Sequence, residues 1–294
     1  MAALVKALHL ALRPLPIGFV SDLGARLARL NVRFVNPQVA QNARRNVRRH
    51  FPDLPEAEVE ALVRRFVGNV GRLMTEFSVI HRFAAAKRME FVGVDVARVD
   101  VGKIPTIALC LHLGNWEVLA GAMQAIGIPV ASISEVRRNE AQRDIAAATR
   151  RGFDLRVLAP DQSGLRQALS ILRGNGVLAI FPDEKRDGTM MAPLFGRPPH
   201  AKGNLALVAR LARRTGAQLV VTYCERVDAT HFRLCFEPPF QMKGEGPGML
   251  ADVALLNSRI EPVILRHLDQ WYYLDDPIGP IEPEPADRAG TPDG

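Results

Sequence analysis

Residues 106–117 read TIALCLHLGNWE, and this stretch decides the fold class. Its first six residues form a continuous apolar run, which is typical of a short β-strand that is buried on both faces. His112 follows the run directly, and a helical pattern begins within the next few residues. A buried strand that passes through a tight turn into a helix is the repeating unit of an α/β domain.

Similar short apolar runs recur along the chain and alternate with helical stretches. The predicted strands are residues 130–133, 155–158, 177–181 and 219–224, and the predicted helices are residues 117–126, 139–151, 164–173 and 204–214. Residues 231–237 alternate polar with apolar side chains, as an edge or antiparallel strand does, and residues 252–268 predict a last helix. This order predicts an α/β fold with a largely parallel or mixed central sheet flanked by helices.

The two ends of the chain differ from this central pattern. Residues 1–35 hold two apolar segments with arginines set to one side, and neither reaches the roughly 20 apolar residues that a bilayer span needs. They are predicted to be amphipathic helices that associate with a membrane, with ordinary core helices as the alternative. Residues 36–276 form the predicted main domain, and the Pro- and Asp-rich residues 277–294 predict a disordered tail.

The charge of the chain limits its partners. The 294 residues carry a formal net charge of +7, and arginine-rich stretches such as residues 44–49 predict an acidic partner, unless they are only solvated helix surfaces. Aromatic residues are sparse and no nucleic-acid-binding motif is present, so an anionic membrane surface or an acidic carrier protein is favoured over nucleic acid. Cys110, Cys224 and Cys235 have no paired spacing, which argues against a disulfide framework or a zinc site.

His112 and Glu117 are the predicted chemical pair. Residues five apart cannot share one face of a helix, so the pair must straddle the end of the strand and the start of the helix. Asn115 is the predicted N-cap, which places Glu117 in the first helical turn, where the helix dipole favours a carboxylate. From there a carboxylate can hold one imidazole nitrogen and leave the other to remove a proton from a hydroxyl.

The same pattern allows other interpretations of these residues. The carboxyl ends of strands are where ligands usually bind in open α/β sheets, so the position of His112 agrees with a chemical role. The spacing alone also fits a structural histidine that a nearby acid satisfies. Cys110 is interpreted as a small core residue. No Gly-x-Ser-x-Gly turn lies near these positions, which argues against a serine hydrolase.

The motif around His112 resembles the signature of a known family. Residues 112–117 (HLGNWE) are similar to the His-x-Gly-Asn-Trp-Glu motif of the bacterial lipid A biosynthesis acyltransferases, the lauroyl/myristoyl branch of the lysophospholipid acyltransferase superfamily. Further similar blocks follow in the family's order and extend the resemblance over residues 36–273. They are residues 46–54 (NVRRHFPDL), 181–183 (FPD), 193–196 (PLFG), 209–217 (ARLARRTGA), 257–261 (NSRIE) and 269–272 (DQWY).

The resemblance implies a glycerolipid acyltransferase-like fold and an O-acyltransferase domain over residues 36–276. The fatty acyl group would pass from acyl carrier protein, or alternatively acyl-CoA, to a hydroxyl of a lipid A precursor at the cytoplasmic face of the inner membrane. No metal or tightly bound cofactor is implied. His112 would be the general base and Glu117 its orienting partner. Arg150 is the expected oxyanion donor, with Arg151 equally well placed and Arg137 and Arg138 behind them, and Arg137 and Arg151 are expected to bind substrate. The alternative is that most of these four arginines are only solvated helix charges.

Three segments depart from the family pattern: residues 132–138 (SISEVRR), 183–185 (DEK) and 268–270 (LDQ). They lie where an acceptor is expected to be recognised. The sequence therefore leaves open a phospholipid, aminolipid or metabolite acceptor, and also an inactive lipid- or carrier-binding protein. Asp183 is expected either to position the acceptor or to cap the turn that ends at Gly188. Asn115 is expected to contact substrate.

Overall fold

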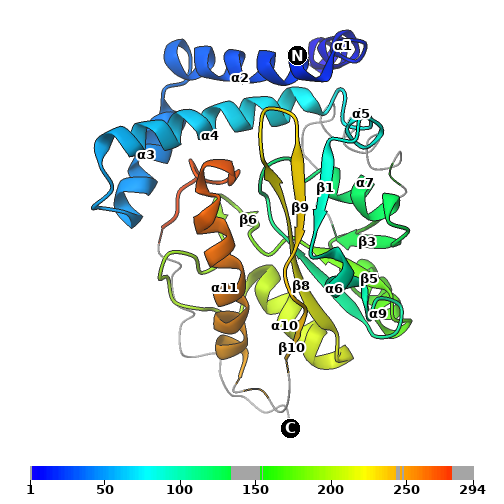
Figure 1. The fold of residues 1–294 in the computed structure, drawn as a ribbon. Helices are drawn as coiled ribbons and strands as arrows, with labels where there is room; N and C mark the ends of the chain where they lie inside the picture. The colour runs from blue at the N-terminus through cyan, green and yellow to red at the C-terminus, as the bar shows by residue number, and fades with distance from the viewer. Residues whose placement is uncertain (1, 134–152, 154, 243–245, 247, 280–294) are drawn as a thin grey trace.

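A computed structural model describes residues 2–133, 153, 155–242, 246 and 248–279 (Figure 1). The helices are α1 (Ala2–Leu12), α2 (Ile17–Phe34), α3 (Gln38–His50), α4 (Glu56–Glu76), α5 (Arg82–Ala85), α6 (Val94–Arg98), α7 (Val118–Ala125), α9 (Gln162–Arg173), α10 (Gly203–Thr215) and α11 (Met249–Arg266), with a 3-10 turn η1 (Leu268–Gln270). The strands are β1 (Met89–Val92), β2 (Thr106–Cys110), β3 (Val130–Ile133), β4 (Arg156–Leu158), β5 (Val177–Ile180), β6 (Lys185–Arg186), β7 (Thr189–Met190), β8 (Gln218–Arg226), β9 (Phe232–Phe236) and β10 (Phe240–Gln241).

The described strands form a central sheet in the order β1-β9-β8-β2-β5-β3-β4, with β10 paired to the beginning of β8. β2 is parallel to both of its neighbours, β5 and β8, and β3 is parallel to β5 and β4. β9 runs antiparallel to β8, and β1 is parallel to β9. The predicted α/β fold with a largely parallel, mixed sheet is therefore confirmed.

The buried strands begin and end close to the residues that the apolar runs predict. β9 is antiparallel to β8, as the alternating pattern of residues 231–237 predicts. It is not an edge strand, because β1 pairs with its other side. The sequence does not predict β1, since its four residues are alternately half-buried and exposed and carry no continuous apolar run. The predicted helix over residues 139–151 lies outside the described residues.

Helices cover both faces of the sheet, and β2 shows how the two cores differ. Ile107 and Leu109 belong to a core shared with α9, α10 and α11, whereas Ala108 and Cys110 belong to a second core shared with α6 and α7. Side chains on the first face are large. Toward the carboxyl ends of the strands, the second face instead carries small side chains, and this difference leaves space between the sheet and the elements above it.

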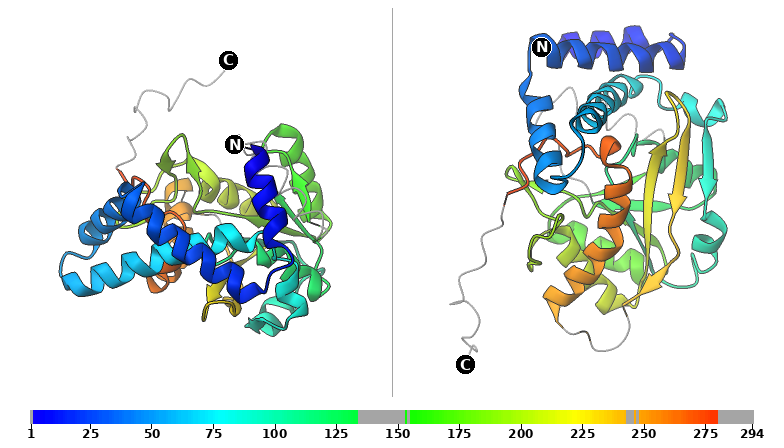
Figure 2. Two further views of the ribbon diagram at one scale, coloured as in Figure 1. Left: turned by 90° about the horizontal axis from the view of Figure 1, so that it is seen from above. Right: turned by 60° about the vertical axis from the view of Figure 1, so that its left-hand side comes forward.

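The predicted helices of residues 1–35 are present as α1 and α2, which lie across one end of the molecule over α4 (Figure 2). α2 and α4 approach closely at Gly24 and Gly71, where a Cβ on either glycine would lie 2.3 Å from the other's carbonyl oxygen. Within the described chain, no helix combines the length and the apolar character that a membrane crossing requires. Residues 277–279, predicted to open the tail, stay on the main domain, where Ile278 is buried. Residues 280–294 lie outside the described residues.

Candidate functional site

His112 is held by Asp183 through two hydrogen bonds. The backbone N–H of His112 donates to Asp183 Oδ2 at 2.9 Å, and the imidazole Nδ1 lies 2.9 Å from Asp183 Oδ1. Trp271 Nε1 donates to the same Oδ2 at 3.0 Å. An ionised carboxylate only accepts hydrogen bonds, so the proton of the neutral imidazole sits on Nδ1 and Nε2 keeps a free lone pair.

The sheet topology brings this pair together. His112 follows β2 and Asp183 follows β5, and these two strands are parallel neighbours. Their carboxyl ends therefore lie side by side, although 71 residues separate the two side chains in the sequence. Asp183 is fully buried, and its side chain contacts His112 and Trp271. Its expected part in positioning the acceptor or in capping the turn near Gly188 stays a prediction.

Aromatic rings fix the orientation of the imidazole. The ring of His112 lies 4.4 Å from Phe181, 4.9 Å from Trp116 and 5.0 Å from Tyr273, measured between ring centroids. The segment after α11 also reaches the loop, since the backbone N–H of Tyr272 donates to the carbonyl of His112 at 3.0 Å. The resemblance to the family includes this closing segment, but the sequence does not predict its contact with His112.

Gly114 explains why the 112–117 loop can make so tight a turn. Its φ is +58°, which side chains rarely adopt, and a Cβ there would lie 2.4 Å from the carbonyl oxygen of Cys224. The N–H of Gly114 donates to the carbonyl of Gln270 at 3.1 Å. The loop is therefore pressed against β8 and tied to η1, and this position accepts only glycine without rearrangement.

The helix after the loop begins later than predicted. α7 starts at Val118 with Glu117 as its N-cap residue, so the prediction that Asn115 caps the helix and that Glu117 lies in the first turn is wrong. Asn115 instead begins a turn that its own carbonyl closes with the N–H of Val118 at 3.1 Å. Its side-chain amide is engaged elsewhere, donating to Glu76 Oε2 at 2.8 Å. A capping contact would use the side-chain oxygen as acceptor, and Oδ1 of Asn115 has no hydrogen-bond partner among the described residues.

The predicted site residues separate into two groups. His112 and Glu117 both line one cavity, and the side chain of Glu117 is largely buried. Asn115 is fully buried, does not line this cavity and contacts Glu76 on α4, and its expected contact with substrate stays a prediction. Arg137, Arg150 and Arg151 lie outside the described residues.

The cavity beside His112 has a volume of about 1410 Å³. On the sheet side its wall consists of small residues contributed by four neighbouring strands, namely Ala108 and Cys110 from β2, Ser132 from β3, Ala179 from β5 and Thr222 from β8. α7 adds Leu119 and Met123. Burial raises the pKa of the Cys110 thiol to about 12, so this cysteine stays a neutral wall residue, as the sequence predicts.

Charged residues gather at another part of the same cavity. Lys185, Arg186, Lys202 and Arg210 line it together with Glu184. Glu184 Oε1 accepts a hydrogen bond from the N–H of Asn204 at the start of α10, at 2.7 Å. Burial raises the pKa of Glu184 to about 7, despite the opposing charge of Arg186. Among the described residues, no cluster of His, Cys, Asp and Glu is arranged to hold a metal ion.

Most of the chain is similar to known proteins. Residues 1–276 match the family described as bacterial lipid A biosynthesis acyltransferase. No curated protein matches the chain. A solved structure that it resembles is the 1-acyl-sn-glycerophosphate (LPA) acyltransferase, PlsC, from Thermotoga maritima, at 13% sequence identity and a TM-score of 0.39, covering 85% of this chain and 95% of that chain.

The family match runs through the whole architecture described above. It includes α1 and α2, every described strand of the sheet, the 112–117 loop and the closing segment that contacts His112. The residues expected from the resemblance to the family thus lie within the matched region. This chain belongs to the bacterial lipid A biosynthesis acyltransferase family and is a lipid acyltransferase.

Proposed function

We propose that this enzyme transfers a fatty acyl group from acyl carrier protein to a hydroxyl of a lipid A precursor. The observation that carries the proposal is that His112, held by the buried Asp183, lines a cavity whose sheet side carries several small residues. A base alone suits many reactions. A base beside a cavity of about 1410 Å³ that is partly lined by apolar side chains suits acyl transfer.

The chemistry needs one base and no covalent enzyme intermediate. Nε2 of His112 removes the proton of the acceptor hydroxyl while that oxygen attacks the thioester carbonyl. The tetrahedral oxyanion then collapses, the carbon–sulfur bond breaks, and the leaving thiolate takes the proton from the imidazolium. Arg150 is the proposed donor to the oxyanion, with Arg137 and Arg151 as proposed substrate contacts.

Two carboxylates share the support of the base in this proposal. Asp183 holds Nδ1 and thereby keeps Nε2 free for the acceptor proton. Glu117, the acid that the motif predicts as the orienting partner, lines the cavity on the side of α7. Its proposed part is to act with His112 at the reacting centre, where a negative charge steadies the imidazolium that forms during transfer.

The donor and the acceptor are assigned from charge. Acyl carrier protein is acidic, and the net charge of +7 on this chain favours such a partner, with acyl-CoA as the alternative thioester. Lys185, Arg186, Lys202 and Arg210 are the proposed contacts for the anionic groups of a lipid A precursor, in a cavity that is also lined by Glu117, Asp161, Glu184 and Asp187. A phospholipid would satisfy the same charges and is the alternative acceptor.

The amphipathic helices are proposed to bind the cytoplasmic face of the inner membrane. Phe19, Leu27, Leu30 and Phe34 recur at helical spacing on α2, and each is about half exposed or more. Arg26 and Arg33 lie beside this apolar row and suit anionic headgroups. A lipid surface is the occupant that fits both features, and it would deliver a membrane-bound acceptor to the cavity.

The experiment combines a panel of donors with a panel of acceptors. Purified protein is incubated with acyl carrier protein or coenzyme A bearing different chains, and with a lipid A precursor or a phospholipid. Transfer to the lipid A precursor supports the proposal, and transfer only to another lipid moves it to the alternative acceptor. His112→Ala should abolish transfer while its circular dichroism stays that of the wild type. A folded His112→Ala protein that still transfers would exclude His112 as the base, and carrier binding without any transfer would identify an inactive binding protein.

A further inference from the structure

A buried ion pair lies behind the 112–117 loop, outside the cavity. Arg226, at the end of β8, donates from Nη1 to Glu76 Oε1 at 2.8 Å and from Nη2 to Glu76 Oε2 at 2.7 Å. The side chain of Glu76 is fully buried, and that of Arg226 is 4% exposed. Moving two charges out of water costs free energy, so the burial of this pair is not by itself evidence that the pair stabilises the fold.

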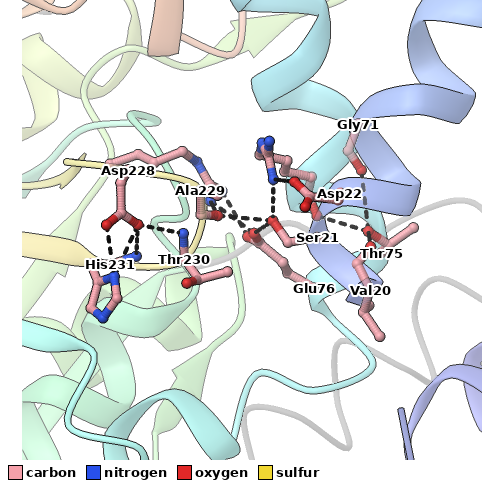
Figure 3. Close-up of polar contacts among 12 residues, drawn as sticks. Val20, Ser21, Asp22, Gly71, Thr75, Glu76, Asp228, Ala229, Thr230 and His231 are labelled. Carbon is pink, nitrogen blue, oxygen red and sulfur yellow. Dashed lines mark hydrogen bonds and ion pairs between the residues drawn. The ribbon is translucent and has the colours of Figure 1, made fainter. Parts of the chain in front are cut away.

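Glu76 joins three parts of the molecule that are far apart in the sequence. Besides Arg226, its carboxylate accepts a hydrogen bond from Asn115 Nδ2 at 2.8 Å and one from Ser21 Oγ at 2.7 Å. Figure 3 shows Ser21 on α2 and Glu76 on α4 turned toward one another beside Ala229. The carboxylate is thus the common point of α2, α4, β8 and the loop that carries His112.

The contact with Asn115 determines the conformation of the loop. Asn115 is fully buried, and its Oδ1 has no hydrogen-bond partner among the described residues, so the contact with Glu76 is what satisfies its amide. The neighbouring Gly114 is tied to Gln270, and the side chain of Gln270 in turn brackets the backbone of Arg226, at 2.7 Å and 3.0 Å. The side chain of Glu76 therefore holds Asn115, and the backbone of Arg226 is connected to the adjacent Gly114 through Gln270.

The contact with Ser21 connects this arrangement to the amino-terminal helices. Arg72 Nη1 donates to Ser21 Oγ at 2.9 Å. Thr75 Oγ1 donates to the carbonyl of Val20 at 2.9 Å (Figure 3). Together with the close approach of Gly24 to Gly71, these contacts fix the position of α2 along and against α4. A displacement of α2 would remove a donor from the carboxylate that positions Asn115.

We propose that Glu76, with Arg226, is a positioning residue for acyl transfer, which acts through Asn115 on the 112–117 loop and makes the loop sensitive to the seating of α2 through Ser21. This inference rests on the proposed function for its kinetic test. Glu76 touches neither the cavity nor the reacting atoms, so its effect belongs to the placement of His112 and Glu117. A misplaced catalytic group lowers kcat and leaves the binding of the donor unchanged.

The test uses variants that cut the network at different points. Asn115→Ala breaks the link to the loop and keeps the ion pair, Glu76→Gln breaks the pair, and Ser21→Ala removes the contact with α2. The matched control is Asp252→Asn, which breaks the bidentate pair of Arg213 with Asp252 between α10 and α11, remote from the loop. Thermal unfolding gives the loss of stability for each variant.

The expected result is a fall in kcat of about tenfold or more for Asn115→Ala and for Glu76→Gln, with KM for the donor unchanged. The double variant should be no slower than the slower single variant, because both changes cut one connection. Ser21→Ala should give a smaller fall in kcat, and Asp252→Asn should lose stability without losing kcat. Wild-type kcat in folded Asn115→Ala, or multiplying effects in the double variant, would overturn the proposal.

A second measurement separates this inference from the proposed function. The imidazole resonances of His112 in ¹⁵N-labelled protein report the placement of the ring without any acyl transfer. Asn115→Ala and Glu76→Gln should shift them, and Asp252→Asn should leave them in place. If the wild-type protein transfers no acyl group from any donor, the proposed function fails, and the resonances still decide the positioning. Unshifted resonances in both loop variants would then overturn it.

Discussion

At the scale of single residues, the proposed base, His112, is held by groups that come from both sides of the loop. Asp183 and Trp271 fix the proton-bearing edge of the imidazole, and the rings of Phe181, Trp116 and Tyr273 restrict its rotation. Burial also raises the pKa of the Tyr273 phenol, so this residue remains a neutral ring beside the histidine. The arrangement leaves Nε2 as the position at which a proton can be taken.

Replacing Asp183 by Asn tests which acid sets the proton of the imidazole. The amide of Asn can present a donor to Nδ1, which would move the proton to Nε2 and remove the base. We expect Asp183→Asn to lower kcat by about 10²-fold or more with little change in KM, measured by steady-state transfer. Trp271→Phe removes only one support of Asp183 and should have a smaller effect. If Glu117→Gln abolished transfer while Asp183→Asn stayed near wild type, the orienting role would belong to Glu117.

Glu184 should make stability depend on pH. Burial raises its pKa from 4.5 to about 7, so between these values the folded protein holds a proton that the unfolded chain releases. The free energy of unfolding should therefore fall as pH rises from about 4.5 to about 7, by about 2 to 3 kcal/mol at most. Urea unfolding of Glu184→Gln across this range should show a flatter profile, with its stability relative to wild type higher at pH 8 than at pH 4.5.

Glu60 supplies the control for that experiment because its pKa moves the other way. Its hydrogen bond with Arg44 lowers the pKa of Glu60, so the stability it contributes is present above pH 4.5 and is lost as pH falls through the lowered value. Glu60→Gln should lower stability near neutral pH and have little effect in acid. An identical pH profile for Glu184→Gln and wild type would contradict the assignment of the buried carboxyl.

At the scale of elements, the sequence predicts what is local and misses what depends on strand order. Apolar runs identify β2, β5 and β8 because both faces of these strands are buried, and shorter runs also identify β3 and the edge strand β4, although β4 is largely exposed. The contact between His112 and Asp183 needs the knowledge that β5 lies beside β2, which no local pattern contains. The helix that the sequence predicts starts earlier than α7, because Asn115 turns its side chain toward a buried glutamate on α4, a contact that no local pattern contains.

The small-residue face of β2 should set the length of the acyl chain. Ala108 and Met123 line both the main cavity and a second cavity of about 20 Å³ behind it, so they stand at the boundary between the two. Ala108→Leu should exclude the end of a long chain and lower kcat/KM by about tenfold for a donor two carbons longer than the new limit. Shorter donors should react as in the wild type. Met123→Ala should extend the limit, as competition between donors of mixed length would show.

At the scale of the whole molecule, the cavity and the amino-terminal helices are connected structurally. α1 and α2 lie over α4, and α4 ends at Glu76, which contacts the loop beneath the base (Figure 2). The apolar row on α2 faces away from α4. The side of α2 that packs against α4 holds the buried Val20, Ser21 and Gly24. A membrane surface that binds the exposed side of α2 would therefore keep α2 in contact with Glu76, which positions the loop.

Binding to anionic vesicles tests the role of that apolar row. Leu27→Glu with Leu30→Glu replaces two side chains that are 47% and 52% exposed, so the fold should tolerate both. Each leucine that enters lipid contributes about 1.5 to 3 kcal/mol, so the double variant should bind vesicles of phosphatidylglycerol and phosphatidylethanolamine at least about tenfold more weakly in sedimentation. Leu250→Glu with Leu255→Glu, on the solvent side of α11, is the matched control and should bind as the wild type does. Equal loss in both double variants would assign binding to net charge, and no loss in either would remove α2 from the membrane contact.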